Sequence, residues 1–305
     1  MKYYAGIDIG GTNIKTCIID EAGQILSEDS IPTGAGRPQE TVLKDIISSV
    51  RTSISRAGVS PVAAGMGTPG LIDSEAGVVI YNNNLGWREF DVAPKMSKAL
   101  NIPVTLENDA DAAALGEVVA GCAKGARSAM IITLGTGVGS GYVVEGKIVR
   151  GCEFGHMVIS YGGRECTCGR KGCFEAYCSA TGLINMTREM IASNPNGITA
   201  GIAEREGTVS GHTVFDGAEN GDADAVNLID EYTSYLACGL ANLANGLQPE
   251  VIGIGGGIGK QGERLLAPLR KKVNDEIYKG MTPPRIVSCT LGYKAGLIGA
   301  GMAAK

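Results

Sequence analysis

The chain has 305 residues, of which 44% are hydrophobic, and a formal net charge of −5. This length allows a large buried core and favours two domains over one. The acidic balance excludes nucleic acid as the expected partner, because neutralising a phosphate backbone takes clustered lysine and arginine. Since no leader pattern opens the chain and no run of about 18 apolar residues is uninterrupted, we expect no secretion signal, no membrane span and a cytoplasmic location.

The opening of the chain predicts a strand meander. Runs rich in β-formers cover residues 3–9, 14–19 and 24–31, and glycine-containing turns separate them. The same pattern returns over residues 129–134, 139–144 and 148–149. This repetition indicates an internal duplication in which a meander opens each half.

Apolar periodicity predicts an alternation of helices and strands along the rest of the chain. The alternation indicates an α/β fold with two related halves and a cleft between them. We predict an N-terminal domain over 1–115, with a C-terminal helix over 294–305 packing back on it, and a second domain over 116–293. The expected helices cover 41–57, 91–100, 110–119, 225–247, 259–278 and 294–304, and the expected strands cover 62–66, 103–106, 251–254 and 285–289.

The first glycine-rich turn has the composition of a phosphate site. Two glycines at a hairpin tip let backbone N–H groups approach a polyphosphate, the threonine adds a hydroxyl, and the aspartate at the strand end could orient the hydration shell of Mg²⁺. An ordinary hairpin is the alternative. The candidate residues are Asp8, Gly10, Gly11, Thr12 and Lys15.

Two further glycine clusters are candidates for nucleotide contacts. The turn over 134–141 resembles a dinucleotide fingerprint, but the β-branched and aromatic run after it predicts a second strand where that motif needs a helix. The cluster over 253–259 follows a strand and precedes a helix, where a base and ribose could lie against the backbone. The candidate residues are Gly135, Thr136, Gly137, Gly256 and Gly257.

A polar segment between a strand and a helix, residues 107–111, supplies a candidate base. Helix capping by Asn108 or Asp109 is the alternative explanation for its composition. In phosphoryl transfer, a placed carboxylate orients a substrate hydroxyl and accepts its proton. Asp109 is a better candidate for this role than Asp111.

The segment over 153–175 carries a metal-ligand pattern. Three thiolates and one imidazole, from Cys166, Cys168, Cys173 and His156, complete a tetrahedral Zn²⁺ shell and leave no open position. Such a site is structural. We expect the other six cysteines to behave as small core residues, because a long chain without a signal peptide keeps its thiols reduced. We expect His212 at the surface.

Together, these motifs resemble the ROK family of sugar kinases and sugar-responsive repressors. The Glu-x-Gly-His and Cys-x-Cys-Gly-x-x-Gly-Cys-x-Glu signature is present over 153–175 without departure, and the turn at Asp8 and the Glu-Asn-Asp-Ala segment match as well. The resemblance implies a duplicated actin-like ATPase (ribonuclease H-like) fold, a homodimer or homotetramer, and Asp109 as catalytic base. It also implies a set of sugar contacts made by Gly70, Asn84, Asn108, Glu153, His156 and Glu175.

The resemblance predicts an ATP-dependent glucokinase that uses Mg²⁺, holds structural Zn²⁺ and forms a hexose 6-phosphate. N-acetylmannosamine and fructose are the alternative substrates, and polyphosphate stays open as an alternative donor. Because only seven residues precede Asp8, we expect no DNA-binding domain of the repressor kind. A non-catalytic sugar-responsive regulator should have lost Asp109 or the phosphate glycines, and a zinc-ribbon interaction module would not need them.

Overall fold

The computed structural model describes residues 1–34, 36–83 and 85–305 and divides into two compact units. Unit 1 comprises 1–131, 141–150 and 290–305, and unit 2 comprises 132–140 and 151–289. The predicted domain limits, 1–115 with 294–305 and 116–293, stay a prediction.

A five-stranded sheet forms the centre of unit 1. Its order is β3-β2-β1-β4-β8, with β1, β2 and β3 antiparallel and β4 and β8 parallel to β1. The meander is antiparallel because tight turns join its strands, whereas a parallel pair needs a longer crossover. The strands are β1 (Tyr3–Ile9), β2 (Asn13–Asp20), β3 (Ile25–Pro32), β4 (Ala63–Thr68) and β8 (Val104–Asn108).

The second sheet repeats this order. It runs β11-β10-β9-β12-β13, so a three-strand meander is again followed by two further strands on its other side. The predicted duplicated α/β fold of the actin-like class is therefore confirmed. The strands are β9 (Ser128–Leu134), β10 (Val138–Val144), β11 (Lys147–Val149), β12 (Val251–Gly255) and β13 (Arg285–Ser288).

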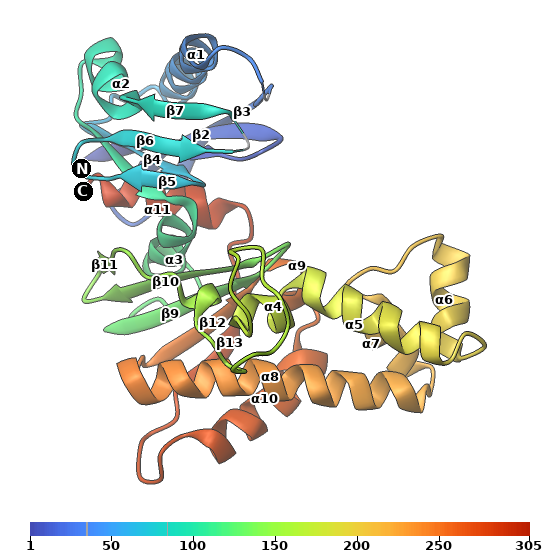
Figure 1. Ribbon diagram of the computed structural model, residues 1–305. Helices are drawn as coiled ribbons and strands as arrows, with labels where there is room; N and C mark the ends of the chain where they lie inside the picture. Colours follow the sequence, from blue (N-terminus) through green and yellow to red (C-terminus); the bar gives the residue numbers. More distant parts are fainter. Residues whose placement is uncertain (35, 84) are drawn as a thin grey trace. The chain divides into compact units, whose positions relative to one another are not determined.

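Helices cover both faces of the first sheet (Figure 1). Helix α1 (Gln39–Ala57) packs against β2 and β3, and α11 (Lys294–Ala303) packs against β1, β4 and α3 (Asp109–Ala120). The α11 side is closely packed because glycines face it: a Cβ at Gly6 or Gly65 would collide with carbonyl groups of α11. This contact buries one side of α11 against β1, the strand that carries Asp8, and against β4.

Unit 1 also contains a small sheet that the sequence pattern did not predict. Its order is β5-β6-β7, and the buried Trp87 and Phe90 of β7 pack edge to face with ring centroids 5.0 Å apart. Its strands are too short for a clear alternation. The elements are β5 (Leu71–Asp73), β6 (Val78–Asn82), β7 (Trp87–Phe90) and the following helix α2 (Val92–Leu100).

The helices of unit 2 pack around α8 (Ala223–Leu247), which contacts α4, α5, α7 and α10. A single helix was predicted over 259–278, but the structure interrupts it at Gly262, whose φ of +58° favours glycine. No helix within the described ranges is long and apolar enough to cross a membrane. The other helical elements are η1 (Phe154–His156), α4 (Phe174–Cys178), α5 (Ala180–Ser193), α6 (Ile198–Glu206), α7 (Thr213–Glu219), α9 (Gly256–Gly259) and α10 (Glu263–Glu276).

Candidate active site

Two carboxylates of unit 1 lie at the same edge of the first sheet, where β1 and β8 end on either side of β4. Asp8 is the penultimate residue of β1, and Asp109 begins α3 directly after β8. Strands β1 and β8 both run parallel to β4, so their carboxyl ends meet at one edge of the sheet. This topology brings together two acidic groups that are about 100 residues apart in the sequence.

Both carboxyl groups have raised pKa values. Burial and the negative charge of Asp109 raise the pKa of Asp8 to about 6, although the positive charge of Lys15 partly opposes them. Burial raises the pKa of Asp109, while the backbone N–H of Ala110 lowers it. A raised pKa brings a carboxylate closer to the range in which a general base works well at neutral pH.

Asn108 is the N-cap of α3. Its Oδ1 accepts hydrogen bonds from the backbone N–H groups of Ala110 at 2.8 Å and Asp111 at 3.4 Å. The N–H of Ala110 also donates to Asp109 Oδ1 at 2.9 Å. The cap therefore fixes the start of the helix that carries Asp109, and it leaves the amide nitrogen of Asn108 as the atom that could donate to a ligand. Capping and a binding role are compatible here.

The turn between β1 and β2, residues 10–13, is called the first hairpin. It is stabilised by Thr33, a buried residue just beyond β3, whose hydroxyl donates to the Gly10 carbonyl at 2.6 Å and whose N–H donates to Thr12 O at 2.9 Å. Gly11 and Thr12 are exposed. The tip is thus open to a ligand while its base is held by the same meander.

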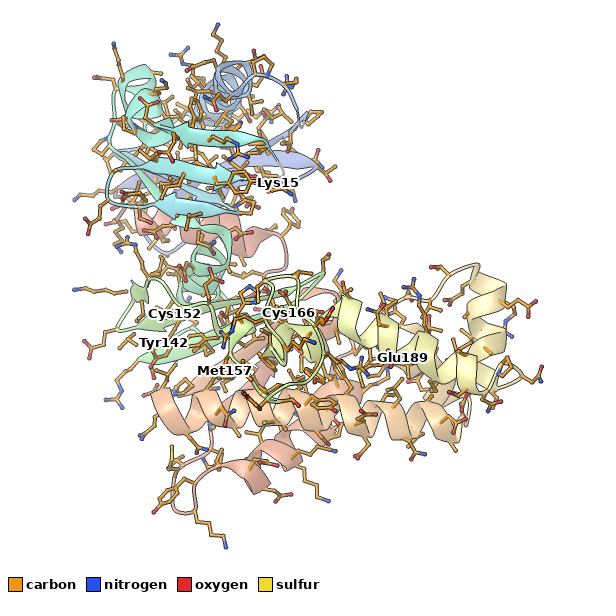
Figure 2. All side chains as sticks on the ribbon, in the orientation of Figure 1. Lys15, Tyr142, Cys152, Met157, Cys166 and Glu189 are labelled. Atoms are coloured by element: carbon orange, nitrogen blue, oxygen red, sulfur yellow. The ribbon has the colours of Figure 1, made fainter. Side chains whose placement is uncertain are left out.

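Lys15, which is labelled in Figure 2, lies on β2 opposite Asp8 in the β1–β2 pair. Its ammonium group sits 3.8 Å from the ring centroid of Tyr293, which forms a cation–π contact. The Tyr293 hydroxyl in turn donates to Glu28 Oε1 at 3.4 Å. The structure therefore places Lys15 next to the first hairpin, with its ammonium group over the ring of Tyr293.

Gly70 adopts a φ of +105° and lies against the end of β6, where a Cβ would collide with the Tyr81 carbonyl. The buried Asn82 holds this turn, because its Nδ2 donates to Pro69 O at 2.7 Å and its Oδ1 accepts from the Leu85 N–H at 3.0 Å. Asn84, predicted to contact the sugar, lies outside the described residues.

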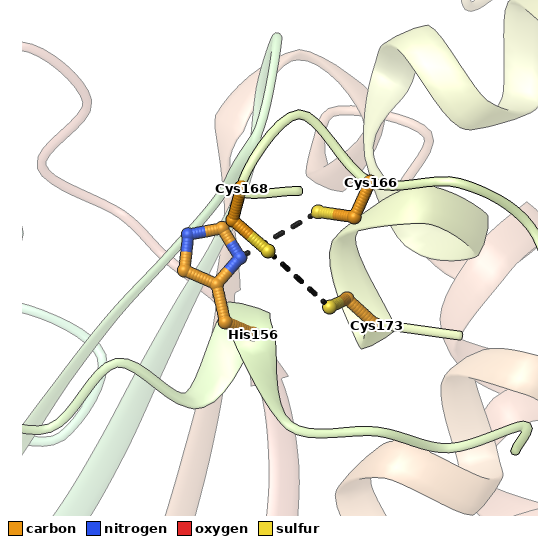
Figure 3. Close-up of side chains that lie close together, drawn as sticks. All are labelled: His156, Cys166, Cys168 and Cys173. Carbon is orange, nitrogen blue, oxygen red and sulfur yellow. Dashed lines mark hydrogen bonds between the residues drawn. The ribbon is translucent and has the colours of Figure 1, made fainter. Parts of the chain in front are cut away.

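The predicted metal ligands of unit 2 come together (Figure 3). The ligand atoms of His156, Cys166, Cys168 and Cys173 all lie within 4.8 Å of one another. His156 ends η1, and the cysteines belong to the segment over 157–173, called the metal loop, which runs into α4; Cys166 is labelled in Figure 2.

The distances between the ligand atoms of this cluster fit a tetrahedrally coordinated ion. Zn–S bonds of about 2.3 Å place the sulfurs of a tetrahedron about 3.8 Å apart. The observed separations are 3.7 Å between the sulfurs of Cys168 and Cys173 and 3.7 Å between Cys166 Sγ and His156 Nδ1. Burial and the neighbouring thiols raise the pKa of Cys173 to about 12, so a bound cation is what would make it a thiolate at neutral pH.

Two glutamates flank the cluster. Glu153 is exposed and precedes η1, and its carbonyl accepts from the His156 N–H at 3.0 Å. Glu175 lies in the first turn of α4, and its carboxylate accepts from the Thr167 hydroxyl at 3.2 Å and from the Val138 N–H at 3.0 Å. Because Nδ1 of His156 faces the cysteines, its Nε2 is the nitrogen left for a ligand.

The second and third glycine clusters adjoin each other in unit 2. Residues 135–137 join β9 to β10, as predicted, and are called the second hairpin. Gly256 follows β12 with a φ of +80°, and a Cβ there would collide with the backbone of Leu134. Neighbouring strands therefore deliver both glycine clusters to the same edge of the second sheet.

Several residues of these sites were not predicted from the sequence. Thr33, Tyr293 and Thr181 each contact a predicted residue from a distant part of the chain, and Arg150 pairs with the buried carboxylate of Glu107 beside Asn108. None of them belongs to a sequence motif. Each contacts a residue that is distant in the sequence and comes close only in the folded chain. His212 is exposed, as predicted, and its Nδ1 pairs with Gln261 Nε2 at 2.6 Å.

Known proteins resemble the chain over its whole length. A glucokinase of Halalkalibacterium halodurans is 35% identical over 319 residues, which span 100% of this chain and 95% of that protein. A xylose repressor of Bacillus subtilis is 27% identical. That alignment covers 97% of this chain and 75% of the repressor.

Solved structures agree with these relatives. A ROK hexokinase from Thermus thermophilus has a TM-score of 0.86 at 31% identity, with 99% of this chain and 97% of that one covered. A ROK family glucokinase from Streptomyces griseus, in complex with glucose and AMPPNP, has a TM-score of 0.78 at 32% identity, with 99% of each chain covered. Residues 4–305 match the ROK family, and the chain belongs to it.

Proposed function

We propose that the protein is an ATP-dependent glucokinase that transfers the γ-phosphoryl group of ATP to the 6-hydroxyl of glucose. The observation that carries this proposal is the pairing of Asp109, a partly buried carboxylate with a raised pKa, with Asp8 and a glycine hairpin in one unit. The full-length likeness to glucokinases supports the choice of sugar.

In this proposal, Asp109 is the general base. Its carboxylate accepts a hydrogen bond from the sugar 6-hydroxyl and takes the proton as the hydroxyl oxygen bonds to phosphorus and the bond to ADP breaks. The Asn108 cap and the Ala110 N–H keep the carboxylate at the start of α3. The base is thereby positioned before substrate binds.

The glycine turns are proposed to bind the phosphates of ATP. Gly10, Gly11 and Thr12 offer N–H groups and a hydroxyl at an exposed tip, and Asp8 behind them would orient the water shell of Mg²⁺. Mg²⁺, when bound, would neutralise negative charge on the phosphoryl group that is transferred. Lys15 adds positive charge close to Asp8. In unit 2 the proposed nucleotide contacts are Gly135, Thr136, Gly137, Gly256 and Gly257.

We propose that His156, Cys166, Cys168 and Cys173 hold one structural Zn²⁺. Four protein ligands complete its tetrahedral shell, so the ion would brace the loop and leave phosphoryl transfer to other groups. The metal loop has few regular elements of its own, which is the situation in which a metal contributes folding free energy directly.

The sugar contacts are carried over from the family resemblance as part of the proposal. The residues are Gly70, Asn84, Asn108, Glu153, His156 and Glu175. His156 would use Nε2 for the sugar, since its Nδ1 faces the thiols. The metal would then hold a sugar contact in place directly.

N-acetylmannosamine and fructose remain the alternative substrates, and polyphosphate the alternative donor. A sugar-responsive regulator is the alternative of another class, motivated by the likeness to the xylose repressor. The presence of both Asp109 and the phosphate glycines favours catalysis. A homodimer or homotetramer and a cytoplasmic location stay predictions.

ADP release tests the proposal. Purified protein is mixed with MgATP and, in turn, glucose, N-acetylmannosamine and fructose, and the phosphorylated product is identified by mass spectrometry. We expect glucose to stimulate release most and to give glucose 6-phosphate. Release stimulated by another hexose would replace the substrate, and release by none of them would contradict a kinase.

A further inference from the structure

The second hairpin is held in place by the segment that follows the metal loop. Three hydrogen bonds join them, and all three lie within unit 2. The Val138 N–H donates to Glu175 Oε2 at 3.0 Å, the Ala180 N–H donates to Gly135 O at 2.7 Å, and the Thr181 hydroxyl donates to Thr136 O at 2.8 Å. The hairpin therefore takes its support from α4 and α5 in addition to its own strands.

The carboxylate of Glu175 is shared between the metal loop and the hairpin. Its Oε1 accepts from the hydroxyl of Thr167 at 3.2 Å, and Thr167 lies in the metal loop between two proposed zinc ligands, Cys166 and Cys168. Its Oε2 accepts from Val138, the first residue of β10. One side chain thus links the metal loop, through Thr167, to the proposed phosphate hairpin.

Two glycines make this contact close. A Cβ at Gly137 would collide with Glu175 Oε2, and a Cβ at Gly155, in η1 next to His156, would collide with the Val138 carbonyl. The hairpin is therefore packed against the residues at both ends of the metal loop. A displacement of Gly155 or Glu175, which lie on either side of that loop, would therefore press on the backbone at Gly137 and Val138.

We propose that Glu175 and Thr181 are positioning residues for the nucleotide phosphates, and that the metal loop affects nucleotide affinity through Glu175. This inference rests on the proposed kinase function. Its consequence is that nucleotide affinity depends on Glu175, Thr181 and the metal even when no sugar is bound. A residue that only contacts sugar has no such effect.

Binding of MgADP without sugar, measured by calorimetry, tests the role of Thr181. Thr181→Val removes the hydroxyl that holds Thr136, and loss of one neutral hydrogen bond predicts a dissociation constant about 5-fold higher. Thr181→Ser keeps the hydroxyl and should restore the parent value. Ser193→Ala is the matched control, because this hydroxyl lies on the same helix and donates only to its own helix, at Glu189 O.

The role of Glu175 is tested in the same assay. Glu175→Ala removes an acceptor that carries charge, so we expect MgADP to bind about 10-fold more weakly or worse in the absence of sugar. If Glu175 contacts only sugar, MgADP affinity will equal that of the parent, and this result would overturn the proposal for Glu175.

The dependence on the metal is tested with Cys168→Ser, which removes an exposed ligand that makes no contact with Glu175 among the described interactions. We expect zinc to be lost by elemental analysis and MgADP affinity to fall as it does in Glu175→Ala. Retained affinity in a folded, zinc-free variant would overturn the metal link. If this variant does not fold, the zinc-loaded Thr181→Val and Glu175→Ala proteins decide the roles of those two residues, and MgADP binding to the parent protein before and after zinc is removed with a chelator and dialysis decides the metal link.

Failure of this inference can be told apart from failure of the proposed function. A parent protein that binds MgADP and phosphorylates glucose, with unchanged MgADP affinity in Thr181→Val and Glu175→Ala, refutes only the inference. A parent protein that binds no nucleotide refutes the kinase and the inference together.

Discussion

The two glycine hairpins occupy equivalent places in the duplicated sheets but are supported differently. The first follows β1 and is held by Thr33, which comes from the end of the same meander. The second follows β9 and is held by Glu175 and Thr181, about 40 residues further along the chain and beyond the metal loop. The same strand geometry thus occurs twice, but the second copy is supported by a segment that follows the proposed metal loop.

The chemistry next to the two hairpins also differs. The first has two carboxylates with raised pKa values, Asp8 and Asp109, at the neighbouring strand ends. The second has a carboxylate, Glu175, that is occupied by N–H and hydroxyl donors. Only the first region offers a group suited to accept a proton, so we expect the two regions to respond differently to substitution.

The largest expected effect is a loss of turnover caused by a substitution next to the first hairpin. Asp109→Asn removes the proposed base while its amide oxygen can still accept from the Ala110 N–H. We expect kcat to fall about 1,000-fold, the middle of the range for a lost general base, with glucose binding and zinc content retained. Asp91→Asn is the control, since this exposed aspartate also precedes a helix. Turnover near the parent rate would remove Asp109 from its role.

Loss of a proposed metal ligand should affect the metal content and the stability of the second region. Cys166→Ser should release zinc and lower the free energy of unfolding by about 3 kcal/mol or more, since structural zinc binds small finger peptides with about 10 to 16 kcal/mol and the surrounding core offsets part of this. Cys238→Ser, which changes a thiol outside the cluster, should keep the metal. Elemental analysis and thermal unfolding measure both effects; unchanged zinc content would exclude the cluster as the site.

The raised pKa of Asp8 predicts an effect on stability with a defined sign. The folded state binds the Asp8 proton more tightly than the unfolded state does, so the ionised group destabilises the fold fully above pH 6, and this penalty disappears below pH 4. Without Mg²⁺, Asp8→Asn should therefore raise the free energy of unfolding at pH 7.5 by roughly 1 to 3 kcal/mol, at about 1.4 kcal/mol per pKa unit.

Denaturant unfolding at pH 7.5 and at pH 4 measures this difference. The gain should vanish at the lower pH, and a gain of equal size at both values would show that the Asp8 charge is not its cause. The same titration predicts that kcat/KM of the parent enzyme, which reports ionisation in the free enzyme, falls as the pH drops below about 6. Asp8→Asn should also lose MgATP affinity, which separates its role from that of Asp109.

The smallest expected effect sharpens the comparison of the two supports. Thr33→Val removes the hydroxyl that donates to Gly10 O and leaves a buried acceptor, at a cost of about 1 to 2 kcal/mol. We expect a higher KM for ATP with the zinc content unchanged, because Thr33 contacts the first hairpin and no metal ligand among the described interactions. If Thr33→Val released zinc, the two hairpins would share one support after all.

The sequence predicted the parts of the molecule whose signals are local. The two meanders, the turn that joins β9 to β10, the capping segment at Asn108 and the four metal ligands are each contained in short stretches, and the structure shows these elements and gathers the ligands. Family membership, carried by the same stretches, is confirmed. The sheet of β5 to β7 and the helices α4 to α7 were not predicted, because short strands and short helices rich in small and polar residues carry little periodicity.

What holds each site in place was decided only by the tertiary structure. Thr33, Tyr293, Glu175 and Thr181 act through partners between 23 and 278 residues away, and nothing in their local sequence indicates those partners. The raised pKa of Asp8 likewise arises from burial and from Asp109, two conditions that exist only once β1 and β8 share a sheet. A sequence determines which groups are available, whereas the packing of distant segments sets their environment and hence their chemistry.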